Sequence, residues 1–312
     1  MDKVWNYKNF NMVIELDVSG EFIYNGIHEI NRLTSFSNDG ATFSSLYSLA
    51  VGIERLQKIV CVLWGMEYYE NENDFENSLI THSHMELRDK VNEFLQRKNE
   101  SISFSARENE FLSLLSQFYK SARYLRFNVD GEWAKEVELL KAYITKYLDE
   151  DIYEILDSNR IVATDKVKAL FGRVVGSISK KYYKLIVKGS SSSNNTFTYE
   201  LRSGSKAQKV FLNMNRKNSL MIEQMNERIA LKELLIYLRC SNDKCAFLDF
   251  IDNIEPLDFD SAMVTEYLSE LVYGNVPQDL IDEVEYLYSE NKYSAQRIQT
   301  VDLFANNKIY FD

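Results

Sequence analysis

Proline is nearly missing from this chain, and its scarcity constrains the fold more than any other feature of the sequence. Only Pro256 and Pro277 occur among 312 residues, so the first 255 residues contain none. Proline breaks a helix because it lacks the backbone N–H and its ring collides with the preceding turn. The composition, 45% hydrophobic and 27% charged residues, is typical of a globular protein. We therefore expect a mainly helical protein with enough chain for two buried cores.

Apolar residues recur at steps of three and four in the first half of the chain, which is the pattern of amphipathic helices. One helix is predicted from about Phe10 to Phe36 and a second from Thr42 to Trp64. Three later stripes predict further helices: Ile80, His84, Leu87, Val91 and Phe94; Phe111, Leu115, Phe118, Ala122 and Leu125; and Trp133, Val137, Leu140, Ile144 and Tyr147. Short polar connections favour an antiparallel bundle over residues 1–150.

Residues 151–312 form a second predicted region, rich in helix and divided from the first near residues 149–163. The stripe from Val167 to Ile178 is helical, whereas the β-branched and aromatic stretches 183–187 and 196–201 predict one β-hairpin. Helical patterns return over 205–239, over 260–273 with Asp260 as the N-cap, and after Pro277.

Cysteine usage and the N-terminus indicate a reducing compartment. Three cysteines at irregular spacing do not make a disulfide framework. The sequence begins without the basic and apolar segments of a signal peptide, and its longest apolar run, Ile59 to Trp64, is too short to cross a membrane. We expect a cytoplasmic protein without a membrane span.

The sequence lacks the usual motifs of cofactor and metal sites. It contains no glycine-rich nucleotide loop, no zinc-protease motif and no nucleophile elbow. Cys240 and Cys245 have no histidine or second cysteine pair nearby to complete a zinc site. We predict neither a cofactor nor a metal.

Three stretches of the first half resemble a family of small helical domains. They are LYSLAVGIERLQKI at 46–59, with a Glu and a Lys one turn apart; THSHMEL at 81–87, similar to a His-x-x-Leu helix opening; and SARYLRF at 121–127, similar to an Ala-Arg-Tyr segment. Through them residues 10–148 resemble the HEPN superfamily of prokaryotic defence, toxin and RNA-processing domains. The resemblance implies a helical bundle that forms a homodimer and acts on RNA.

Many members of that family are metal-independent ribonucleases with an Arg-x4-6-His motif. A 2′-hydroxyl attacks the adjacent phosphate, a histidine moves the proton, and an arginine stabilises the added charge. The motif is absent here, because no arginine precedes His28, His82 or His84 at that spacing. The rearranged catalytic set that we predict is His84, Arg88 and Arg123, of which the first two lie one helical turn apart.

These candidate residues also have structural interpretations, which stay open at this point. His84 lies on an apolar stripe and is suited to the protein interior. Arg123 and Arg126 are suited to the end of their helix, where they would bind its last carbonyl groups. Glu54 and Lys58 are interpreted as an ordinary i,i+4 ion pair. His82 is interpreted as an exposed histidine.

Charge is strongly segregated although the net charge is −11. Residues 160–217 hold 13 bases against two acids, and the bases interleave with aromatic residues, as in nucleic-acid-binding surfaces. The residues predicted to bind nucleic acid are Arg173, Lys181, Tyr182, Lys184, Lys188, Arg202, Lys206 and Lys209. Two alternatives stay open: acidic neighbours such as the run from Asp249 to Asp260 neutralise the segment, or it contacts membrane lipid.

The family resemblance and the basic segment support one hypothesis, and the missing catalytic motif supports another. In the first, the chain is an RNA-directed protein, either a metal-independent ribonuclease or an RNA-binding component of an antiviral defence or toxin system. In the second, it is a non-catalytic dimeric interaction module whose basic segment contacts a partner protein or its own acidic tail. Binding to RNA that weakens as salt rises would favour the first.

Overall fold

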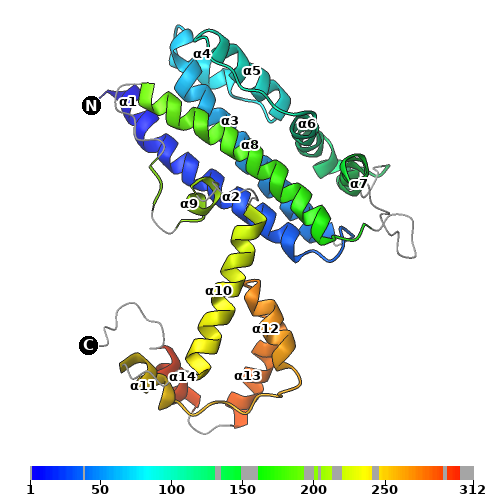
Figure 1. Cartoon of the computed structure of the whole chain (residues 1–312), viewed down its shortest axis with the longest axis vertical. Coiled ribbons are helices and arrows are strands. Elements are labelled where there is room, and N and C mark those ends of the chain that lie inside the picture. The colour runs from blue at the N-terminus through cyan, green and yellow to red at the C-terminus, as the bar shows by residue number, and fades with distance from the viewer. Residues whose placement is uncertain are drawn as a thin grey trace. The chain divides into compact units, whose positions relative to one another are not determined.

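Helices dominate the computed structural model, which describes residues 2–37, 39–130, 135–148, 161–192, 200–202, 205–212, 220–240, 246–290 and 294–302. The predicted mainly helical fold class is confirmed (Figure 1). The chain divides into two compact units, residues 1–224 and 225–312. The boundary predicted near residues 149–163 falls, in sequence, within the first unit.

The first unit begins with a nearly continuous helical run. It comprises α1 (Lys3–Asn6), the π-helical turn η1 (Tyr7–Asn11) and α2 (Met12–Arg32). The elements that follow are α3 (Asp39–Gly65), η2 (Met66–Tyr68), α4 (Glu72–Ser78), α5 (His84–Gln96), α6 (Ala106–Lys120), η3 (Ala122–Phe127), α7 (Lys135–Tyr147), α8 (Asp165–Ser192) and α9 (Lys206–Phe211). Trp133, with which the fifth predicted stripe begins, lies outside the described residues.

Helices α2 and α3 form a closely packed antiparallel pair. Arg55 of α3 pairs with Glu15 of α2. Four residues further along α2, the hydroxyl of Ser19 donates to the carbonyl oxygen of Gly52 at 2.8 Å. Residue numbers therefore rise along one helix as they fall along the other. A Cβ atom at Gly52 would lie 2.7 Å from Cγ1 of Ile23, so glycine permits this close approach.

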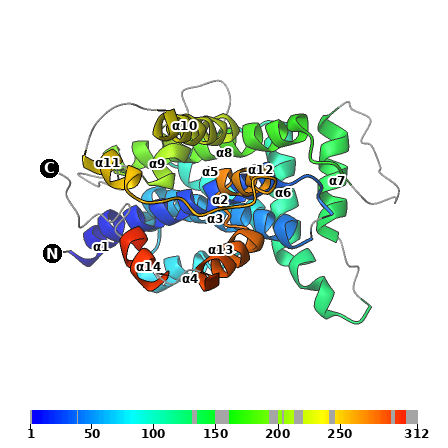
Figure 2. The same cartoon turned by 90° about the horizontal axis from the view of Figure 1, so that it is seen from below.

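Helix α3 lies at the centre of the first unit, because it contacts α2, α5, α6, α7 and α8. Its fully buried side chains include Leu49, Ile53, Leu56 and Val60. Figures 1 and 2 show α2, α3 and α8 running side by side. The indole Nε1–H of Trp64, near the end of α3, donates to the carbonyl oxygen of Leu185 in α8 at 2.9 Å.

The predicted β-hairpin is not seen. Its first strand, residues 183–187, belongs to α8, and residues 200–202 have no strand structure. Residues 193–199 lie outside the described residues. A buried stripe at helical spacing runs through α8 and explains the difference: Val167, Phe171, Val174, Ile178, Tyr182 and Leu185. Burial of this stripe overrides the local strand preference of aromatic and β-branched residues. In the described part of the chain, β-pairing is limited to an isolated antiparallel bridge between Ser35 and Val162.

The second unit is also helical. Helix α10 (Leu220–Cys240) starts at the end of the first unit and is followed by α11 (Ala246–Asp252), α12 (Val264–Val272), α13 (Gln278–Glu290) and α14 (Ser294–Asp302). Asp260 does not cap α12, because Met263 occupies the N-cap position. Its carboxylate accepts instead from the backbone N–H of Ala262 at 2.9 Å. Among the described helices, none combines the length and apolar character that a bilayer span requires.

Candidate functional site

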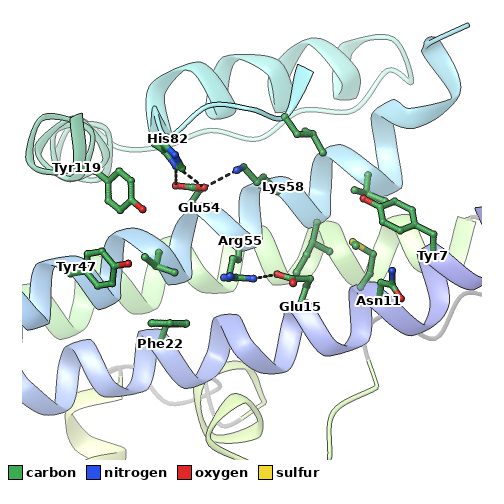
Figure 3. Close-up of a pocket in the computed structure, with 15 residues that line it drawn as sticks. Tyr7, Asn11, Glu15, Phe22, Tyr47, Glu54, Arg55, Lys58, His82 and Tyr119 are labelled. Carbon is green, nitrogen blue, oxygen red and sulfur yellow. Dashed lines mark hydrogen bonds and ion pairs between the residues drawn. The ribbon is translucent and has the colours of Figure 1, made fainter. Parts of the chain in front are cut away.

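A pocket of about 470 Å³ lies beside the antiparallel helices α2 and α3 (Figure 3). Its lining comes from η1 and α2 (Tyr7, Asn11, Met12, Glu15 and Phe22), from α3 (Tyr47, Val51, Glu54, Arg55, Lys58, Ile59 and Val62), and from Leu79, His82 and Tyr119. The last three precede α5 or belong to α6. We call this the α2–α3 pocket.

The helical repeat explains why these residues share one pocket. Residues 47, 51, 54, 58 and 62 of α3 follow one another at steps of three or four and so lie along one face. Residues 7, 11 and 15 have the same spacing along η1 and α2. Because the two helices are antiparallel, Tyr7 and Asn11 lie at one end of the pocket and Phe22 and Tyr47 at the other (Figure 3).

Glu54 carries the most buried charge of the pocket, with 8% of the residue exposed. Burial of a carboxylate is costly unless it is paired. Nζ of Lys58, one turn further along α3, donates to Glu54 at 2.7 Å. Nδ1 of His82 lies 3.1 Å from the other carboxylate oxygen. The buried carboxylate thus holds together two groups from separate segments of the chain.

His82 stands directly before α5, whose N-cap is Ser83. The Ser83 hydroxyl accepts from the backbone N–H of Glu86 and fixes the start of the helix. A carboxylate only accepts hydrogen bonds, so Nδ1 of neutral His82 carries the proton toward Glu54 and Nε2 is left as an acceptor. The His82 side chain is 53% exposed. A carboxylate–histidine pair with a mostly exposed ring is the arrangement that general acid–base catalysis uses.

Aromatic rings and a guanidinium group surround this pair. The ring of Tyr119 lies 4.8 Å from that of His82 and 5.9 Å from that of Tyr47. The guanidinium of Arg123 lies 3.7 Å from the Tyr119 ring centroid, and its Nε atom is buried without a hydrogen-bond partner among the described residues. Stacked rings and a cation beside them are groups that can bind a base and a phosphate.

His84, the predicted catalytic histidine, belongs to a buried polar network instead. Its Nδ1–H donates to Oε1 of Gln57 at 2.9 Å, and Nε2 of Gln57 donates to the Tyr182 hydroxyl at 2.9 Å. All three residues are fully buried. Burial disfavours the imidazolium ion and lowers the pKa of His84 to about 4. In this geometry His84 is a neutral interior residue, and Tyr182, predicted to bind nucleic acid, has no exposed ring.

The other two predicted catalytic residues lie apart from His84 in their contacts. Arg88 donates to Oδ1 of Asn109 at 2.8 Å and to Oδ1 of Asp89 at 2.6 Å. Arg123 stacks on Tyr119 beside the α2–α3 pocket. No hydrogen bond, ion pair or ring contact joins His84, Arg88 and Arg123, which all belong to the described part of the chain.

Part of the predicted nucleic-acid-binding segment is neutralised within the first unit. Three of its lysines form ion pairs: Lys181 with Glu108 at 2.6 Å, Lys188 with Glu100 at 2.5 Å, and Lys206 with Glu21 at 2.7 Å. Burial alone would raise the pKa of Glu108, but bonds from Lys181 and Ser177 hold it below its usual range. Lys209 lies 5.6 Å from the ring centroid of Tyr24.

The remaining basic side chains of the predicted nucleic-acid-binding set face solvent. Arg173, Lys184 and Arg202 are exposed. The described residues provide no ion pair or hydrogen bond for these three side chains. The segment therefore combines neutralised lysines with bases whose charge is still accessible to a polyanion.

The predicted i,i+4 pair of Glu54 with Lys58 and the predicted exposure of His82 are both confirmed. What sequence analysis missed is that the same carboxylate binds His82, 28 positions away. One signal pointed toward Glu54: it follows directly on Ile53 of the apolar stripe of α3, where a carboxylate is costly without partners.

The α2–α3 pocket must be interpreted from its own residues. The described residues hold no cluster of three or more His, Cys, Asp or Glu side chains placed to bind a metal ion. No protein-family model matches the chain, and neither a curated protein nor a solved structure matches it.

Proposed function

We propose that this chain is an RNA-directed, HEPN-like protein and that the α2–α3 pocket is its reaction site. The observation that carries the proposal is the Glu54–His82 pair, a buried carboxylate bound to a histidine whose side chain is mostly exposed. All three sequence stretches that resemble the family contribute to this place. Glu54 comes from the first, His82 from the second, and Arg123, beside the pocket, from the third.

In this proposal His82 acts as the general base. Its Nε2 accepts the proton of a 2′-hydroxyl whose oxygen attacks the adjacent phosphate, and Glu54 holds Nδ1–H and stabilises the imidazolium ion. Lys58 and Arg123 supply positive charge to the phosphate. His82 then returns the proton to the leaving 5′-oxygen. The products are a 2′,3′-cyclic phosphate and a 5′-hydroxyl.

The test compares variants in cleavage of a labelled RNA with a chelator present. His82→Ala should abolish cleavage and leave the melting temperature nearly unchanged, because the side chain is mostly exposed. Glu54→Gln keeps the size of the side chain but removes its charge, and should lower the rate by about 10²–10⁴-fold. His28→Ala, which removes a histidine outside the pocket, is the control. Cleavage that persists in His82→Ala, or that requires a divalent metal, would contradict the mechanism.

A non-catalytic interaction module is the second candidate function. It is favoured by the ion pairs of Lys181, Lys188 and Lys206, which reduce the charge that a polyanion can reach. A titration against labelled RNA and DNA at two salt concentrations separates the two candidates. Binding to phosphates must weaken steeply as salt rises. A chain that binds neither nucleic acid at low salt would be the interaction module.

A further inference from the structure

We infer that the α2–α3 pocket receives one nucleobase at its Tyr7 and Asn11 end, and that Asn11 selects adenine or cytosine. These two bases share an exocyclic amine beside an unprotonated ring nitrogen on the edge remote from the sugar. The inference rests on the proposed function, because it names the part of the RNA that the same site reads.

The charges along the pocket orient a nucleotide. His82 lies near Tyr119, and Lys58 lies between His82 and Tyr7 (Figure 3). The guanidinium of Arg123 stacks on Tyr119 at this first end of the pocket. At the other end, Tyr7 and Asn11 also line an adjoining pocket, together with Glu76 and with Glu72, which is ion-paired with Lys3. A phosphate is attracted to the first end and repelled from the second. A nucleotide whose phosphate lies at His82 therefore extends its base toward Tyr7 and Asn11.

The dimensions and the walls of the pocket suit a base in that position. Along α3, the distance from Glu54 to Val62 is about 12 Å at 1.5 Å per residue, comparable with the length of one extended nucleotide. The volume of about 470 Å³ is in the usual range of small-molecule sites. Apolar side chains, Met12, Ile59 and Leu79, line the pocket and can contact the faces of a flat ring.

Asn11 provides the group that reads the base edge. Its side chain is exposed and makes no hydrogen bond to any described residue. The amide offers an acceptor and a donor side by side, which match an amine next to an unprotonated ring nitrogen. Uracil and guanine present a carbonyl oxygen in place of that amine.

Tyr7 has a different role, because stacking does not distinguish bases. Its half-buried ring belongs to the π-helical turn η1 and lines the pocket. Every base has a π-face, so a tyrosine that stacks on it contributes similarly to all four. Affinity at this end therefore depends on Tyr7, and selectivity depends on Asn11.

The experiment measures binding of four RNAs to the full-length His82→Ala protein, which keeps the pocket but should not cleave. The probes are fluorescent uridine heptamers whose central nucleotide is A, C, G or U, compared by anisotropy at one low salt concentration. We expect the A and C probes to bind about tenfold more tightly than the G and U probes, the effect of one bidentate amide–base contact. In the second variant, His82→Ala with Asn11→Ala, this preference should disappear.

Two further variants control the result. Asn92→Ala removes an asparagine of α5 that does not line the pocket, and should keep the preference. Tyr7→Ala should weaken all four probes by a similar factor. Equal binding of the four probes, a preference for G or U, or a preference that survives Asn11→Ala would overturn the inference and leave the proposed function standing. Failure of all four probes to bind would instead overturn the proposed function together with it.

Discussion

His82 and His84 lie two positions apart, but His84 is fully buried and His82 is mostly exposed. Their replacement by alanine should therefore change the stability of the fold by different amounts. His84→Ala should lower the free energy of unfolding by about 1–3 kcal/mol, because it leaves a cavity and removes the donor to the buried Oε1 of Gln57. His82→Ala should lower it by less, since the side chain is mostly exposed and the carboxylate of Glu54 keeps its bond from Lys58. Urea denaturation of both variants measures the difference. Equal stabilities would mean that the buried network does not form.

The pKa of His84 also predicts acid sensitivity. The pKa falls from 6.5 to about 4 on burial, so between these pH values the unfolded chain binds more protons than the folded one. Stability from this residue is complete above pH 6.5 and is lost as pH falls toward 4, by roughly 3 kcal/mol in all. His84→Leu should flatten the dependence of unfolding free energy on pH between 6.5 and 5, measured by urea denaturation. An unchanged slope would contradict burial of a neutral His84.

At the scale of single residues, the apolar pattern of the sequence predicts which side chains are buried, but not which side chains bind each other. The apolar stripe through His84 predicts an interior residue as one of two interpretations, and the burial of His84 agrees with it. The contact between Glu54 and His82 depends on where α5 starts and how that start lies against α3. Neither is encoded in spacing along the chain, which is why the sequence pointed to His84 rather than His82.

At the element scale, two glycines with different surroundings should respond oppositely to alanine. A Cβ atom at Gly20 of α2 would lie 2.3 Å from the backbone Cα of Ala207 in α9, so Gly20→Ala should destabilise the fold by about 1–3 kcal/mol. At Gly40, in the first turn of α3, a Cβ atom meets nothing within 4 Å. Gly40→Ala should stabilise by up to about 1 kcal/mol, because alanine favours helix. Thermal melting compares them, and a Gly20→Ala protein as stable as the parent would rule out this close packing.

Helices were predictable where one periodic signal was strong. The stripes of α3 and α5 are visible in sequence because apolar residues recur at steps of three and four in both helices, although α3, as the central helix, is buried on almost every side after Gly52. The segment 183–187 was wrongly predicted as a strand because aromatic and β-branched residues favour strands locally. It is helical because it continues the buried stripe that begins at Val167 in α8. Helix ends were harder to predict: Asp260 accepts from the N–H of Ala262 as a capping side chain would, but the N-cap of α12 lies three residues later, at Met263.

At the scale of the whole molecule, sequence revealed the charge blocks but not which charges are neutralised. Lys181 binds Glu108, which is separated from it by 73 positions, and the lysine at 188 binds a glutamate 88 positions away. These pairs form because α8 packs among the N-terminal helices, inside the unit of residues 1–224. The change of charge along the sequence favours a domain boundary near residue 150. The long-range ion pairs instead place the basic helix α8 in the same unit as the acidic N-terminal helices.

The exposed bases of α8 predict how RNA binding depends on salt. The double variant Arg173→Gln with Lys184→Gln removes two exposed charges that have no partner among the described residues. If each contacts one phosphate of a single strand, the slope of log association constant against log salt concentration should become less steep by about 1.4, or roughly 0.7 per contact. Anisotropy titrations of a labelled RNA over a series of salt concentrations measure that slope.

A second double variant distinguishes the loss of direct contacts with phosphate from the loss of net positive charge. Lys188→Gln with Lys206→Gln removes the same formal charge, but from lysines that are already ion-paired within the first unit. Their pairing leaves them less able to bind phosphate, so this variant should change the slope by less than the first. Equal changes in both would mean that RNA responds to total charge and not to the exposed face of α8. No change in either would place the RNA elsewhere, with the cationic groups around the α2–α3 pocket as the surface to vary next.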